Sequence, residues 1–67
     1  MVIRKKKYVI ASKNFPLEFD DGDGCAMDNI EDAYFYENRD DAMSVLSRCF
    51  DEPGEHQVID VSVSYEF

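Results

Sequence analysis

The sequence predicts a small α+β domain with one helix packed on one face of a three- to four-stranded, mainly antiparallel sheet. Three observations predict this fold: β-rich segments near both ends of the chain, one central segment with helical spacing of its apolar residues, and a length of 67 residues. A chain of this length forms one domain with a thin core, so residues 1–67 are expected to fold as a single unit. The expected order is strand, strand, short strand, helix, strand.

The first half of the chain predicts two strands joined by a tight turn. Residues 3–12 are β-rich at their centre and show no helical spacing, which indicates a strand. Residues 13–14 suit a turn. Residues 15–20 then alternate apolar and polar side chains, which is typical of a strand with one buried face. Pro16 cannot donate a ladder hydrogen bond, so this second strand is expected at an edge of the sheet.

The middle of the chain predicts a loop, a short strand and the helix. Residues 20–32 are rich in turn formers and carboxylates, and we expect a loop there with a helical turn near residues 27–30. Residues 33–37 predict a short aromatic strand. Asn38 is a favourable N-cap for a helix over residues 39–50, because its side chain can accept a hydrogen bond from the first turn.

Apolar residues in the predicted helix recur at i, i+3, i+4, i+7 and i+8, the spacing of one buried stripe. These residues are Ala42, Val45, Leu46, Cys49 and Phe50. The Pro-Gly pair at 53–54 ends the helix. Residues 57–67 alternate again and predict a long, half-buried final strand. Its apolar face carries Ile59, Val61, Val63, Tyr65 and Phe67.

Composition indicates a folded intracellular protein. An apolar content of 45%, with four tyrosines and five phenylalanines, argues against disorder despite a charged fraction of 33%. Cys25 and Cys49 are too few for a disulfide framework, so reduced thiols are expected, with Cys49 buried on the helix stripe and Cys25 more exposed. The chain shows no signal peptide pattern and no apolar run long enough to span a membrane. We therefore expect a soluble, cytoplasmic protein.

Charge is distributed unevenly along the chain. The net charge is −8, yet the first thirteen residues carry +5 and the remainder carries −13, where only Arg39 and Arg48 oppose fifteen carboxylates. A field of that sign repels nucleic acid and attracts basic protein surfaces. The expected partner is thus a protein with a basic surface, and neither direct nucleic-acid binding nor membrane binding is expected.

The acidic loop raises the question of a calcium site, since four carboxylates lie close together in sequence. They are Asp20, Asp21, Asp23 and Asp28. An EF-hand loop requires oxygen side chains at positions 1, 3 and 5, but a loop starting at Asp20 has Gly22 and Gly24 at positions 3 and 5. A solvated loop is the expected structure, and no metal or other cofactor is predicted.

Catalytic patterns are missing from the sequence. His56 is the only histidine and has no second base or nucleophile near it in sequence, so a surface position is expected. Cys25 would need an activating base and an oxyanion site to act as a nucleophile. Paired carboxylates need a concave pocket, which a single layer of sheet and helix rarely forms. We do not expect an enzyme.

The aromatic segment 34–36 suits a binding surface. Neighbouring residues of a strand point to opposite faces, so Tyr34, Phe35 and Tyr36 cannot all be buried against one helix. Some tyrosine surface is therefore expected to be exposed among carboxylates, as in many protein interfaces.

Four segments together resemble small acidic accessory proteins of bacteriophages and other bacterial mobile elements. They are Lys-Tyr-Val-Ile at 7–10, Asp-Asn-Ile-Glu-Asp-Ala-Tyr-Phe at 28–35, Asn-Arg-Asp-Asp-Ala at 38–42 and Val-Ile-Asp-Val at 58–61. The resemblance covers nearly the whole chain and concerns structural residues. It implies an inhibitor of host defence in a bacterial cytoplasm, of the anti-CRISPR, anti-restriction or repair-inhibitor type, several of which are acidic DNA mimics. The basic first strand departs from a pure mimic.

Two hypotheses follow. The first is an inhibitor or modulator that docks its carboxylate surface into the basic groove of a nucleic-acid-handling host protein. Its expected contact residues are Asp20, Asp21, Asp23, Asp28, Glu31, Asp32, Tyr34, Tyr36, Glu37, Asp40 and Asp41. The alternative is a homo-oligomeric structural or regulatory protein, such as a homodimer, with aromatic and terminal-strand surfaces buried between copies.

Overall fold

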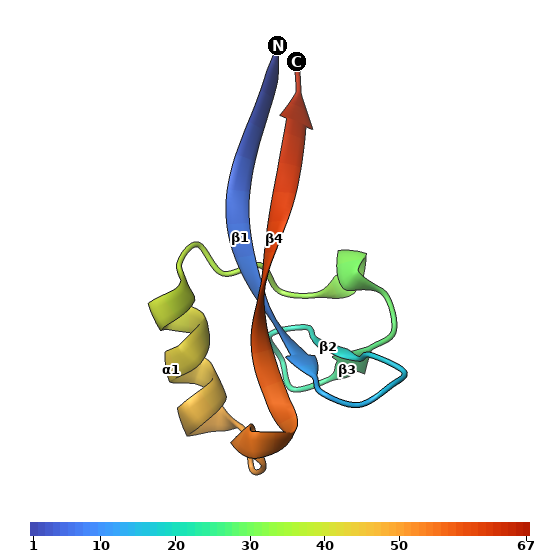
Figure 1. Cartoon of the computed structure of the whole chain (residues 1–67), viewed down its shortest axis with the longest axis vertical. Coiled ribbons are helices and arrows are strands. Elements are labelled where there is room, and N and C mark those ends of the chain that lie inside the picture. Colours follow the sequence, from blue (N-terminus) through green and yellow to red (C-terminus); the bar gives the residue numbers. More distant parts are fainter.

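The fold is built on two long antiparallel strands from opposite ends of the chain (Figure 1). The computed structural model describes all residues, Met1–Phe67. Strand β1 (Val2–Ser12) pairs with β4 (His56–Glu66) in one unbroken register, from Val2 opposite Glu66 to Ser12 opposite His56. Two short strands, β2 (Phe19–Asp20) and β3 (Ala26–Met27), complete a four-stranded antiparallel sheet in the order β3-β2-β1-β4. The predicted α+β class is confirmed.

Half of the β1–β4 pair extends away from the rest of the molecule as a two-stranded arm (Figure 1). This arm gives the protein an elongated shape of 41 × 24 × 18 Å. We call residues 1–6 and 62–67 the ribbon, and the remaining residues the body. The ribbon carries three cations against Glu66 alone, so its side chains sum to +2 and those of the body to −10 within the total of −8. The fold thus separates charge in space.

Helix α1 (Arg39–Cys49) covers one face of the β1–β4 pair. Asn38 caps it as predicted, with its Oδ1 accepting a hydrogen bond from the Asp41 N–H at 2.8 Å. The helix buries Ala42 and Leu46 against Ile10 of β1, with Val45, Phe50 and Val58 among the half-buried side chains around them. This contact is the first of two small hydrophobic clusters.

The second cluster lies on the opposite face of the sheet. Val9 and Ala11 of β1 pack there with Phe19 and Ala33, and four partly buried side chains surround them. These are Leu17, Phe35, Ile59 and Val61. Only eight of the 67 residues are buried, so both clusters are thin and single contacts matter to the fold.

Two predicted strands are wrong in position. Residues 15–20 form a strand only at Phe19–Asp20, and Phe15, expected on a buried face, is 88% exposed. Residues 33–37 form no strand: only Tyr36 pairs with β1, through an isolated bridge to Tyr8, whereas β2 pairs with β1 at Ala11. The third strand is β3, which begins near the expected helical turn of residues 27–30.

Two short 3-10 helices lie before and after α1 in the chain. The first, η1 (Ile30–Asp32), is capped by Asn29, and the second, η2 (Pro53–Glu55), separates α1 from β4. The Pro-Gly pair thus follows the end of α1 as predicted. The apolar alternation of the last strand is confirmed for Ile59, Val61 and Val63, which lie on one face of β4 and are half-buried. Tyr65 and Phe67, expected on the same face, are 42% and 81% exposed, because neither α1 nor the second cluster extends to the end of the strand.

Candidate protein-binding surface

The β2–β3 turn is an acidic loop held by its own carboxylates. Asp20 Oδ2 accepts a hydrogen bond from the Gly22 N–H at 3.1 Å. Asp21 Oδ1 accepts two, from Asp23 at 2.8 Å and from Cys25 at 3.1 Å. These backbone donors hold the pKa of Asp21 below its usual value, because they stabilise the carboxylate form. The loop is therefore ordered and charged.

Tyr34 fixes this loop to the body. Its backbone N–H donates to the Asp20 carbonyl at 3.0 Å, and its ring lies against Gly22. A Cβ at Gly22 would lie 2.9 Å from the Tyr34 Cδ2 atom, so only glycine permits this approach. The ring of Tyr34, half of whose surface is exposed, lies 4.7 Å from that of Tyr36. The pKa of Tyr36 is raised mainly by burial and to a lesser extent by the nearby negative charge of Asp20, because both disfavour the phenolate form.

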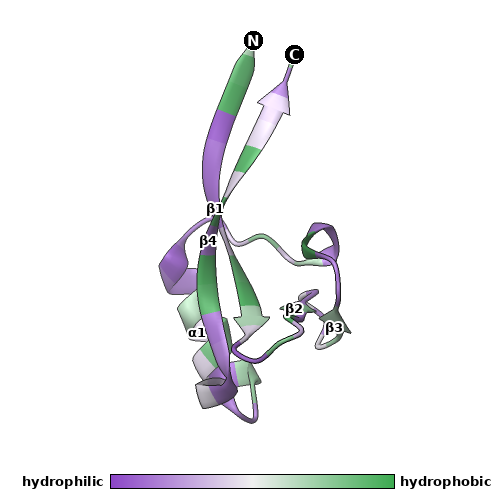
Figure 2. Cartoon of the chain, turned by 45° about the vertical axis from the view of Figure 1, so that its right-hand side comes forward, coloured by the Kyte–Doolittle hydropathy of each residue, from purple (hydrophilic) through white to green (hydrophobic).

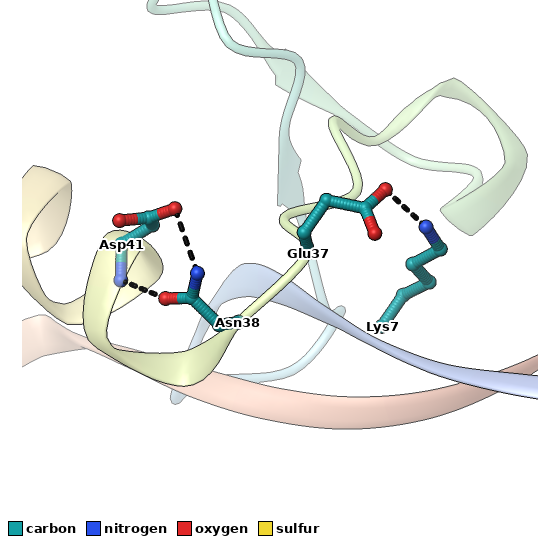
Figure 3. A network of polar contacts seen from close by, with 4 residues as sticks. All are labelled: Lys7, Glu37, Asn38 and Asp41. Carbon is teal, nitrogen blue, oxygen red and sulfur yellow. Dashed lines mark hydrogen bonds and ion pairs between the residues drawn. The ribbon is translucent and has the colours of Figure 1, made fainter.

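A second group of predicted contact residues lies at the start of α1 (Figure 3). Lys7 is buried except for 7% of its surface and donates to the exposed Glu37 carboxylate. This hydrogen bond lowers the pKa of Glu37 and raises that of Lys7, because it stabilises both charged forms. Asp41 accepts a hydrogen bond from the Asn38 side-chain amide at 3.0 Å. Glu37 and Asp41 therefore already have partners within the fold.

The predicted contact residues do not form one continuous surface. Glu31 and Asp32 belong to η1, whereas Asp40 and Asp41 begin α1, and these two elements lie on opposite sides of the β1–β4 pair in both views (Figures 1 and 2). Asp20 belongs to β2 and lines a separate concave site. Sequence patterns could not show this division, since it depends on how the chain wraps around the sheet.

The concave site is a cleft of about 520 Å³ between the β2–β3 turn and the end of α1. Four carboxylates line it, and no lysine or arginine does. They are Glu18, Asp20, Asp51 and Glu52. Apolar lining comes from Phe19, Val45 and Phe50. We call this site the acidic cleft. Its shape and charge suit a positively charged side chain with an aliphatic stem.

Three of the four cleft carboxylates were missed by the sequence reasoning. Asp51 and Glu52 follow the helix directly, and Glu18 precedes the buried Phe19. The available signal was a phenylalanine adjacent to carboxylates at two separate positions. That signal is common on protein surfaces, and only the fold brings the two positions together.

The cleft also contains His56 and both cysteines. His56 Nδ1 lies 3.1 Å from the Glu52 carbonyl oxygen, and its ring packs on Phe50 at 4.7 Å between centroids. Cys25 is exposed as expected. Cys49 is exposed too, so its predicted burial is wrong: the sheet beneath α1 is narrow, and the last turn of the helix lies over the cleft.

Neither metal-binding groups, nor membrane-spanning helices, nor similarity to known proteins assign the chain to a family. No group of three or more His, Cys, Asp or Glu side chains is arranged to hold a metal ion. Neither α1 nor the two 3-10 helices is long and apolar enough to cross a membrane. No family model matches the chain, and no curated protein or solved structure matches it significantly.

Proposed function

We propose that this protein is a binding module that docks its acidic cleft on a basic surface of another protein. The observation that supports this most is the cleft itself, with four carboxylates, an apolar lining and no cation among its residues. As in the sequence-based hypothesis, the partner is a nucleic-acid-handling host protein whose basic groove the module blocks or modulates.

An arginine of the partner would satisfy both halves of the cleft. Its aliphatic stem can pack against Phe19 and Phe50, while its guanidinium donates to carboxylates such as Asp20 or Asp51. Arginine is also the residue with which nucleic-acid-binding proteins make bidentate contacts to phosphate. A cleft that binds arginine in this way occupies the groups that would otherwise hold a phosphate backbone.

The charge separation of the fold favours a defined orientation of the complex. The body carries −10 and the ribbon +2, so a basic groove attracts the body and repels the ribbon. Attraction of this kind mainly raises the association rate and is screened beyond about 8 Å at physiological ionic strength. Binding should therefore weaken steeply as salt is added.

The test uses two variants with the same net charge. The cleft variant neutralises the four cleft carboxylates. It carries Glu18→Gln, Asp20→Asn, Asp51→Asn and Glu52→Gln. The control variant neutralises four exposed carboxylates outside the cleft. It carries Asp28→Asn, Glu31→Gln, Asp32→Asn and Asp40→Asn. Each immobilised protein is exposed to the heparin-binding fraction of a bacterial lysate, and captured proteins are identified by mass spectrometry.

We expect wild type and the control variant to capture the same protein, and the cleft variant to lose it. Added salt and added duplex DNA should both release the captured protein, since each competes for its basic groove. Thermal melts check that both variants remain folded. Equal capture by the two variants, or capture indifferent to salt and to DNA, contradicts the proposal.

A further inference from the structure

The outer edge of β4 has no strand beside it. In the sheet order β3-β2-β1-β4 this strand is last, and its only pairing partner is β1. The register runs through eleven pairs without a bulge, and His56–Glu66 contains no proline, lysine or arginine. Bulges, prolines and lysines are among the features by which proteins block a free edge, and β4 has none of them; its carboxylates are Asp60 and Glu66. This edge therefore remains open to pairing with another strand.

The Tyr8–Tyr36 bridge, on the side of β1 away from β4, determines which backbone groups of β4 point outward. Tyr8 exchanges two hydrogen bonds with Tyr36, at 3.0 and 2.8 Å, so it directs its N–H and C=O away from β4. Its register partner Asp60 must then direct its own groups away from β1, and the alternation of an antiparallel ladder extends this to Ser62 and Ser64. These three residues present unpaired donors and acceptors on the β4 edge.

The ribbon also exposes an apolar face that two strands cannot bury. Ile3, Val63 and Tyr65 lie on one face, and Ile3 and Tyr65 remain 38% and 42% exposed. Helix α1 packs on the other half of the pair, near Val58, and does not cover them. Two-stranded sheets are marginal in water, and a third and fourth strand with a shared apolar face stabilise them.

We propose that β4 of a second copy of this chain occupies the edge. The two β4 strands pair antiparallel about Ser62, which builds a continuous sheet in the order β1-β4-β4-β1. Val61 of each copy then lies opposite Val63 of the other, and Asp60 opposite Ser64. A pairing centred on Val63 would instead oppose Asp60 and Glu66, and like charges directly opposite destabilise a sheet.

Charge also selects β4 over β1 as the self-pairing edge. Four successive cations occupy β1 from Arg4 to Lys7, so antiparallel self-pairing of β1 within that segment sets cation against cation. In the order β1-β4-β4-β1 the two basic strands are the outer ones. Three strand spacings separate them by about 14 Å. This distance exceeds the screening length of about 8 Å at physiological salt.

Pairing about Ser62 sets residues 63–66 of each copy opposite residues 58–61 of the other, so each ribbon lies along the β4 edge of the other body. Because the two β4 strands run antiparallel, the two bodies extend in opposite directions from Ser62. The acidic clefts stay open at the two ends of the dimer. The inference therefore stands without the proposed function, because it uses none of the cleft residues.

Two proline variants at one level of the ribbon test which edge is used. Lys6 and Ser62 are register partners, and both direct their N–H groups outward. Proline at either position removes an outward donor and leaves the β1–β4 ladder its own bonds. Sedimentation velocity over a wide concentration range then measures the dimer dissociation constant of Ser62→Pro, Lys6→Pro and wild type.

We expect wild type to dimerise and Lys6→Pro to dimerise like it. Ser62→Pro should weaken the dimer by about thirtyfold or more, because the self-opposed pair loses both of its hydrogen bonds. If Ser62→Pro fails to fold in a thermal melt, Ser62→Lys replaces it. That variant sets two lysines opposite each other, and its weakened dimer should recover at high salt.

Several results would overturn the proposal. A wild type that stays monomeric at millimolar concentration means that the edge pairs with a foreign strand or with nothing. Equal loss in Lys6→Pro assigns dimerisation to β1. Loss in the cleft variant assigns it to the acidic cleft binding the basic ribbon. By contrast, a dimer that persists at the salt concentration that releases the captured partner separates this inference from the proposed function.

Discussion

Leu46→Ala tests the packing of α1 on the sheet. Leu46 is 7% exposed, lies in the middle of α1 and packs in the cluster with Ile10 and Ala42. The substitution removes three carbon atoms at about 0.8 kcal/mol each, or about 2.4 kcal/mol of transfer free energy. The cavity left behind adds to this, within the observed range of about 2–5 kcal/mol for such changes. A core of this size supplies only about 3–5 kcal/mol in total.

Thermal unfolding followed by far-ultraviolet circular dichroism measures the loss. For a domain of this length about 1 kcal/mol shifts the Tm by about 4–8 °C, so Leu46→Ala should lower it by at least about 10 °C or leave the chain unfolded. Met43→Ala in the same helix is the matched control, since Met43 is 44% exposed. A surface change of that kind shifts stability by about 0.5 kcal/mol at most. Equal melts for the two variants would refute the packing described.

Two further perturbations probe the acidic loop and the Lys7–Glu37 pair. Gly22 and Gly24 share a φ of +91°, but only Gly22 has the Tyr34 ring against it, so in thermal melts Gly22→Ala should destabilise the protein more than Gly24→Ala. Equal losses would show that the Tyr34 contact contributes nothing. The pKa of Glu37 is lowered by Lys7, so its contribution to stability is present above the usual pKa of 4.5 and disappears as pH falls through the lower folded pKa. In acid titrations followed by circular dichroism, Glu37→Gln should reduce the loss of stability below about pH 4.5, and an unchanged acid limb would contradict this.

The sequence predicted the elements whose signals are long. β1, α1 and β4 each run for eleven residues. The apolar periodicity of α1 and of β4 identifies each of them, and the β-rich centre of β1 without helical spacing identifies the first strand. The Asn38 cap could also be predicted, because capping depends only on residues that are neighbours in the sequence.

Short elements and the site depended on tertiary contacts. Phe15 and Phe19 show the same alternation, but only Phe19 reaches the sheet, and of residues 33–37 only Tyr36 pairs with β1, through a single bridge to Tyr8. Burial of Lys7 carries no sequence signal, because it depends on Glu37 lying beside it. The acidic cleft was missed because its carboxylates come from two segments that lie about thirty residues apart in the sequence.

The register of β1 with β4 also determines how the chain must fold. Its partners are 44 residues apart at Ser12 and His56 and 64 residues apart at Val2 and Glu66. Contacts between residues so distant in sequence slow folding, because loop-closure entropy is lost before they form. The shortest loop is the one closed by the Ser12–His56 pair, so pairing of β1 with β4 should begin there and proceed outward along the ribbon. Amide hydrogens should accordingly exchange fastest at the ribbon tip and slowest beside α1.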